Sequence, residues 1–63
     1  MEKMRLPDAE NYLKRHGMPI TQVQLRNWHK AGKIPGMQPM RHSPLLIART
    51  TLDAIIRGDL PKQ

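Results

Sequence analysis

Residues 20–35 read ITQVQLRNWHKAGKIP, and this stretch decides the fold because it carries both a helix start and a helix end. Thr21 is a good N-cap residue, and Gln24 follows it at the spacing of a capping box. Gly32 can adopt the left-handed conformation that ends helices, and the proline three residues later cannot continue one. The stretch therefore predicts a helix over residues 21–31.

The helical period gives this predicted helix two different faces. Leu25, Trp28 and His29 fall on one side, which we expect to face the core. The polar arc on the other side, with its flanks, comprises Gln22, Val23, Gln24, Arg26, Asn27 and Lys30. In a DNA major groove, arginine reads guanine, asparagine or glutamine reads adenine, and valine can touch the thymine methyl group. These six residues are therefore predicted to read bases, the alternative being a polar face that contacts only water.

The length and the composition of the chain predict one small domain. We expect residues 1–63 to fold as a single unit, and a chain this short buries only about 60% of its unfolded surface. With one tryptophan, one tyrosine and no phenylalanine, Trp28 is predicted to be the largest core side chain, packed with Leu25 and Ile34. The absence of cysteine excludes disulfides and thiolate metal sites and fits a reducing cytoplasm.

The charge of the chain predicts a polyanionic partner. Eleven Lys and Arg residues against five Asp and Glu residues give a net charge of +6 and a pI of about 10.6, and we expect double-stranded DNA to be the partner. A membrane surface is the competing polyanion, but no segment has the broad apolar face that an interfacial helix needs. No apolar run is long enough for a signal peptide or a membrane span. We therefore expect no membrane partner and a cytoplasmic location.

Two more helices are predicted around the central one. Residues 7–16 begin with proline and acidic residues and end with basic residues, both of which suit the helix dipole. Residues 17–20 then form a short turn, so that the two helices make a helix-turn-helix unit. Further along, Thr50 is predicted to cap a final helix that ends at Gly58.

The stretch between the second and third predicted helices is too rich in proline and glycine to be helical. The apolar residues at 33–34 and 45–49 on either side of it predict a short antiparallel hairpin, and residues 36–44 would then form a wing. Four residues of this region are predicted to reach a DNA phosphate or an adjacent minor groove: Lys33, Gln38, Arg41 and His42. The alternative is an unstructured, Pro-rich connector. The predicted fold is thus α+β, a small winged helix with a Pro-rich wing and a C-terminal helix.

No motif in the chain predicts catalysis, a metal site or a cofactor. The three histidines, His16, His29 and His42, lie on three different predicted elements, without a nearby cluster of carboxylates or thiols. His29 is more simply explained as a helix residue at the edge of the core, or as a phosphate contact, than as a metal ligand. There is no Gly-rich phosphate loop and no nucleophile motif, so we expect a protein that is not an enzyme.

Two stretches carry a resemblance to a known family. The first is QLRNW at residues 24–28 followed by GKIP at residues 32–35, and the second is LIARTTLDAI at residues 46–55. Over almost the whole chain, the sequence is similar to the MerR-related winged-helix modules of phage excisionases and small AlpA-like regulators, and it most resembles lambda-type excisionases. In order along the chain, the resemblance implies a first helix at 7–16, a basic turn at 17–20, a recognition helix at 21–31 and a wing at 33–49.

The resemblance also implies a function. It would place Gln22, Val23, Arg26, Asn27 and Lys30 in the major groove, and Arg41 and His42 on the wing. An excisionase of this kind has no catalytic chemistry. Several copies bind adjacent sites cooperatively, bend attachment-site DNA and favour excision by a tyrosine-type integrase. The protein would then work in the cytoplasm of a bacterial host and associate with the nucleoid when it is bound to DNA.

Other interpretations stay open on the sequence. Lambda-type excisionases carry a basic extension after the last helix that contacts the integrase, whereas only residues 59–63 follow the last predicted helix here. The resemblance therefore does not extend to that contact. A small transcriptional regulator on the same fold is the alternative function, and a basic protein-interaction module without a DNA role is a third.

Overall fold

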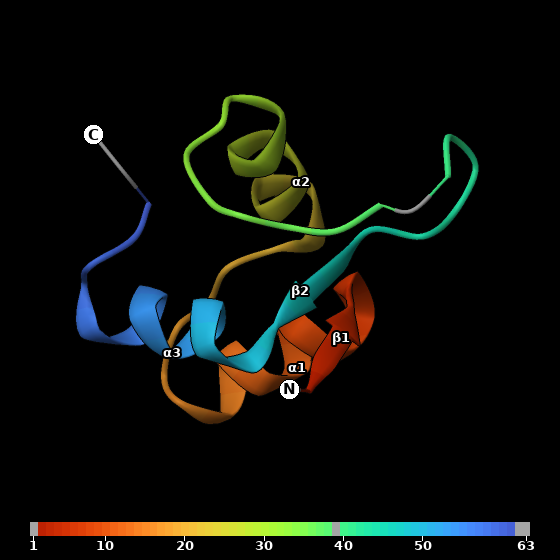
Figure 1. Cartoon of the computed structure of the whole chain (residues 1–63). Coiled ribbons are helices and arrows are strands. Elements are labelled where there is room, and N and C mark those ends of the chain that lie inside the picture. The colour runs from red at the N-terminus through yellow and green to blue at the C-terminus, as the bar shows by residue number, and fades with distance from the viewer. Residues whose placement is uncertain (1, 39, 62–63) are drawn as a thin grey trace.

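In the residues that the structure describes, three helices and two short strands make up the fold (Figure 1). The computed structural model of the chain describes residues 2–38 and 40–61. In chain order, the elements are β1 (Lys3–Arg5), α1 (Leu6–Arg15), α2 (Gln22–Lys30), β2 (Leu46–Ala48) and α3 (Arg49–Arg57). The predicted mixed α+β class is confirmed, and the three predicted helices are present within one or two residues of their expected ends.

The sheet pairs the N-terminal strand β1 with β2, the strand that directly precedes α3. β1 and β2 pair in an antiparallel register that sets Met4 opposite Ile47. β1 was not predicted from the sequence, and the predicted hairpin between residues 33–34 and 45–49 is wrong. Among the described residues, that side of β2 forms an isolated bridge, in which Met37 and Leu46 exchange two backbone hydrogen bonds of 2.8 Å. Ile34 does not pair with β2, and its side chain instead lies in the core, 3% exposed.

The core lies between the three helices and the inner face of the sheet. Its members are Leu6, Ala9, Leu13, Ile20, Leu25, Ile34, Leu45, Ile47, Leu52 and Ile55. The prediction that Trp28 is the largest core side chain is wrong, since Trp28 is only partly buried and packs against this cluster from its edge. Aliphatic side chains fill the interior of such a small domain, and the indole ring covers it from one side.

The ends of the helices follow local signals with one exception. α1 and α3 both end where the chain turns at a glycine with positive φ, as predicted. The predicted cap at Thr50 is wrong: α3 begins at Arg49, with Ala48 as its N-cap and no side-chain cap. β2 runs directly into α3, so the first turn of the helix is held by the strand before it. Lys62 and Gln63 of the predicted C-terminal tail lie outside the described residues.

Candidate nucleic-acid interface

The N-terminus of α2 is held by two different side chains. The Thr21 hydroxyl oxygen accepts a hydrogen bond of 3.2 Å from the backbone N–H of Gln24, so the predicted cap is confirmed. A carboxylate oxygen of Glu10, on α1, accepts a second one of 3.2 Å from the N–H of Gln22. A carboxylate at this end also suits the helix dipole. The second cap ties α2 to α1 and was not visible in the sequence, because the two residues meet only in the folded chain.

The C-terminus of α2 closes in a Schellman motif. The N–H of Lys33 donates to the carbonyl oxygen of Trp28 at 2.9 Å, and the N–H of Gly32 donates to that of His29 at 3.0 Å. Gly32 has a φ of 74°, a conformation that costs a residue with a Cβ atom more than it costs glycine. The predicted end of the helix at Gly32 is thus confirmed. α2 has well-defined ends, which is what a helix that presents side chains to a partner requires.

The buried Leu25 sets the orientation of α2. Its side chain is fully buried, and Trp28 and His29 on the same side are partly buried. Of the six residues predicted to read bases, Gln22 is half-buried at the start of the helix. The other five are exposed: Val23, Gln24, Arg26, Asn27 and Lys30. An α-helix with its side chains is about 10–12 Å across, and the major groove of B-DNA, about 12 Å wide, admits such a helix.

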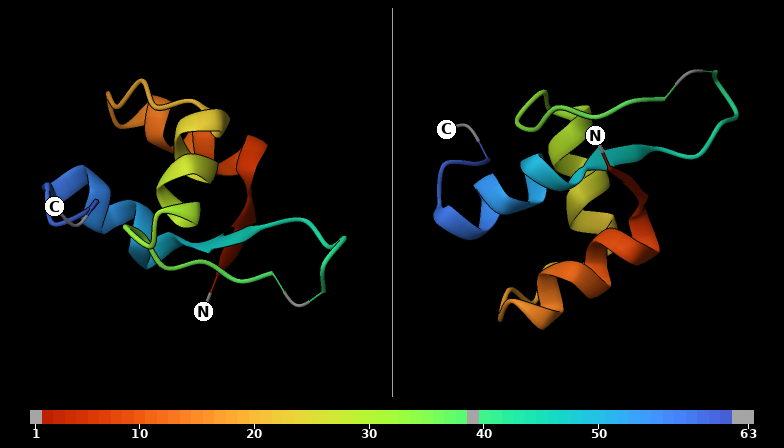
Figure 2. Two further views of the ribbon diagram at one scale, coloured as in Figure 1. Left: turned by 90° about the horizontal axis from the view of Figure 1, so that it is seen from above. Right: turned by 60° about the horizontal axis from the view of Figure 1, so that its bottom comes forward.

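The loop between α2 and β2 projects away from the helices in both views of Figure 2. Residues 40–43 form a turn in which the N–H of Ser43 donates to the carbonyl oxygen of Met40 at 3.0 Å. Arg41 and His42 are both exposed in this turn, and Lys33 is exposed before the loop. Gln38 is exposed as well, so all four residues predicted to contact DNA from the wing are accessible. Pro39 lies outside the described residues.

The fourth, Gln38, has a structural role instead. Its amide nitrogen donates to the carbonyl oxygens of Arg41, at 3.3 Å, and Ser43, at 2.9 Å. A glutamine amide has two N–H donors, and both are used within the loop. A phosphate contact by Gln38 would cost one of these bonds, so the geometry favours Gln38 as the residue that shapes the turn.

The base of the loop packs tightly against α2. A Cβ atom on Gly36 would lie 2.7 Å from Cδ2 of His29 and 3.1 Å from Cδ1 of Leu45. Glycine at this position therefore lets the chain pass close to the imidazole ring. The expected place of His29 at the edge of the core is confirmed, because its side chain is partly buried. This contact joins the start of the loop to the C-terminal half of α2.

The acidic residues are confined to the two ends of the sequence. Residues 11–52 contain no Asp or Glu, whereas they contain seven of the eleven basic residues: Lys14, Arg15, Arg26, Lys30, Lys33, Arg41 and Arg49. The sequence analysis missed this signal, although a count along the chain would have found it. Among the described residues, the ion pairs are Arg49–Glu2 at 3.4 Å and Arg57–Asp59 at 3.1 Å. α2 and the loop thus present cations in a segment without carboxylates of its own, although in the folded chain the Glu10 carboxylate lies at the N-terminus of α2. The excess of positive charge favours attraction of a polyanion.

Asp53 and Tyr12 tie the third helix to the first. The Tyr12 hydroxyl donates a hydrogen bond of 2.6 Å to a carboxylate oxygen of Asp53. This bond, together with desolvation and the negative charge of Asp53, raises the pKa of Tyr12 above its ordinary value of 10.0. The phenol is therefore protonated at neutral pH, and the carboxylate of Asp53 accepts its hydrogen bond from α1. Asp53 is thus a structural residue and not part of the basic surface.

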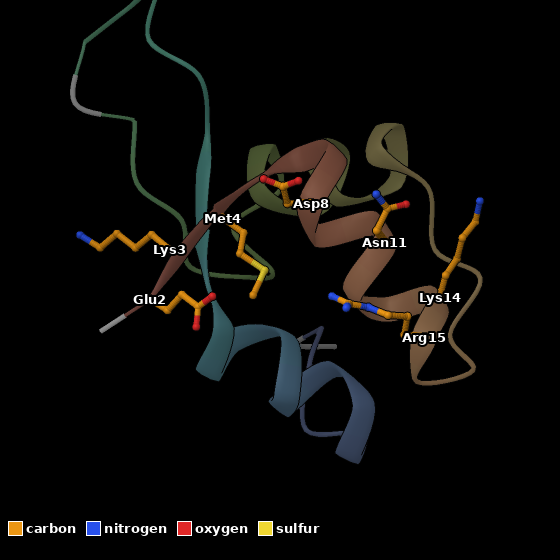
Figure 3. A pocket seen from close by; sticks show the side chains of 7 residues that line it. All are labelled: Glu2, Lys3, Met4, Asp8, Asn11, Lys14 and Arg15. Atoms are coloured by element: carbon orange, nitrogen blue, oxygen red, sulfur yellow. The ribbon is translucent and has the colours of Figure 1, made fainter.

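A groove on the other side of the molecule differs in character. It lies between β1 and α1, has a volume of about 650 Å³, and is lined by Glu2, Lys3, Met4, Asp8, Asn11, Lys14 and Arg15 (Figure 3). Its charges are mixed, and the carboxylates of Glu2 and Asp8 would repel a phosphate chain. In residues 2–38 and 40–61, no cluster of three or more His, Asp or Glu side chains could hold a metal ion. α2 and the loop therefore remain the better candidate surface.

Comparison of the chain with protein-family models, curated proteins and solved structures found no match. In the part of the chain that the structure describes, no helix has the length and apolar character required to cross a membrane. The candidate interface accordingly rests on the geometry and charge of the chain itself.

Proposed function

We propose that this chain is a winged-helix protein that binds double-stranded DNA, with α2 as its recognition helix and residues 36–44 as its wing. The observation that carries the proposal is the exposed face of α2, which combines Arg26, Asn27 and Lys30 in a segment without any acidic residue. Arginine and asparagine can each make paired hydrogen bonds to a base edge in the major groove. Polar helix faces that contact only water usually carry both acidic and basic side chains, whereas residues 11–52 contain no Asp or Glu.

The shape of the molecule supports this assignment. In Figure 1, α2 and the tip of the loop both lie on the upper side, and α1 lies on the lower side. The longest dimension of the molecule is 31 Å, close to one turn of B-DNA, about 34 Å. A helix in the major groove and a loop over the neighbouring backbone would therefore fall within one turn of the duplex.

We further propose an excisionase role, which the resemblance to lambda-type excisionases supports. One module of this size offers few base contacts, so specific binding would need several copies on adjacent sites. Bending a site of this scale costs about 1–6 kcal/mol, and the contacts of neighbouring copies would offset this cost. The partners would be attachment-site DNA and a tyrosine-type integrase.

The contribution of the wing is tested by Arg41→Ala. Arg41 is exposed in the turn of the loop, and its removal should weaken binding to specific and random duplexes alike. The slope of log K against log salt should become shallower by about one unit, because one phosphate contact fewer releases one counterion fewer. Titrations at four or more salt concentrations measure this slope. Parallel lines for the variant and the parent would show that the wing does not touch the DNA backbone.

The excisionase role is tested on a DNA fragment from the attachment region of the element that encodes the chain. Gel-shift titration should give stepwise complexes with more than one copy, and the bend of the fragment should increase. Adding the protein to the cognate integrase should raise excision and leave integration unstimulated. Binding of a single copy at a promoter, with altered transcription and unchanged recombination, would favour the regulator instead.

A further inference from the structure

We propose that Met40 is an apolar wedge that enters the DNA minor groove and unstacks a base step. This inference rests on the proposed function and adds the residue through which the wing would bend the duplex. The Met40 side chain is 72% exposed, more than either of the other exposed large hydrophobic side chains in the described residues, Val23 at 65% and Met37 at 43%. A side chain this exposed contributes little to the packing of the fold, and its place in the turn of the loop makes it accessible to a partner.

The turn that carries Met40 is held in place before any partner binds. The carbonyl oxygen of Met40 accepts a hydrogen bond from the N–H of Ser43, and the Gln38 amide donates to the carbonyl oxygens of Arg41 and Ser43. These bonds cross the loop and give its tip a defined shape. Insertion of Met40 would therefore cost less conformational entropy than insertion from an unstructured loop.

The residues around Met40 favour DNA over a protein as the occupant. Arg41 and His42 follow it directly and are exposed, and the nearest acidic residues in sequence are Glu10 and Asp53. A protein interface would need a contiguous apolar patch, whereas the neighbours of Met40 in the turn are a cation and an imidazole. An arginine and an imidazole beside a single apolar side chain match the wedges of minor-groove proteins, in which basic residues hold the phosphates or the groove floor.

The side chain of methionine suits such a contact. It is unbranched and polarizable, so it can slide between two bases and pack against their faces. Wedges of this kind kink DNA by about 20–90° toward the major groove, which is the side that α2 would occupy. The wedge would thus bend the duplex toward the recognition helix, and an architectural protein would gain contacts from this bend.

The test measures DNA bending and DNA binding separately for Met40→Ala. Ring closure by ligase is followed on a random-sequence duplex of about 120 base pairs, which is shorter than the persistence length of DNA, about 150 base pairs. Protein is added at a concentration that saturates the duplex, as established by gel-shift titration at several salt concentrations. The parent should accelerate ring closure many-fold, and Met40→Ala should reduce the rate to near that of free DNA. The salt slope of binding should not change, because methionine releases no counterion.

One further variant serves as a control. Met40→Leu keeps an apolar wedge and should retain most of the acceleration of ring closure. If Met40→Ala closes rings as fast as the parent while both bind DNA, the wedge is overturned and the proposed DNA-binding function stands. If the parent itself shows no salt-dependent binding to DNA, the proposed function fails, and the wedge fails with it.

Discussion

Leu25→Ala is expected to lower the free energy of unfolding by about 2–5 kcal/mol, the range for truncating a leucine in a well-packed core. Leu25 is fully buried in the middle of α2, within a small core that has ten members among the described residues. Small domains have free energies of unfolding near the lower end of about 5–15 kcal/mol. The substitution is therefore expected to leave a measurable fraction of the chain unfolded at 25 °C.

The measurement is urea unfolding followed by circular dichroism and by the fluorescence of Trp28, the single tryptophan of the chain. Val23→Ala on the same helix is the matched control. The Val23 side chain is 65% exposed, so its truncation should change the free energy of unfolding by no more than about 0.5 kcal/mol. Equal midpoints for the Leu25 variant and the parent would show that α2 is not anchored through Leu25.

Arg26→Ala is expected to weaken binding to a specific duplex by about 1–3 kcal/mol, which is roughly 5- to 150-fold in the dissociation constant. Arg26 is exposed on the face of α2 that lies opposite Leu25. The loss on random duplexes should be much smaller, because a bidentate contact to a base discriminates between sequences and a phosphate contact does not. The specific duplex can be obtained by selection from a random pool, and fluorescence anisotropy then measures both affinities.

Arg57→Ala is the matched control for this experiment. It removes the same charge from the last turn of α3, where Arg57 pairs with Asp59 at 3.1 Å. The control should therefore bind both duplexes nearly as the parent does. Equal losses of affinity on specific and random DNA would show that Arg26 contacts a phosphate and not a base. Unchanged affinity for both would show that α2 is not part of the interface.

Much of the candidate site could be predicted because its signals are local. The cap of α2 at Thr21 depends on a hydrogen bond to a residue three positions away, and its end at Gly32 depends on one backbone conformation. The helical period then separates Leu25 from Arg26 and Asn27 without knowledge of any other element. The wing was less predictable: Gln38 looked like a contact residue in the sequence, and its role in the turn depends on which carbonyl groups the loop brings to it.

The sequence by itself therefore determined the three helices and the face of α2 that is exposed, since these follow from contacts within about four residues. Only the tertiary structure decided the pairing of β1 with β2, the Glu10 cap on α2 and the partial burial of Trp28. A strand of three residues is too short to show a period, and β2, its partner, comes after both α1 and α2 in the sequence. Such contacts form between segments that are far apart in the sequence and come together only when the core packs, so the local sequence does not specify them.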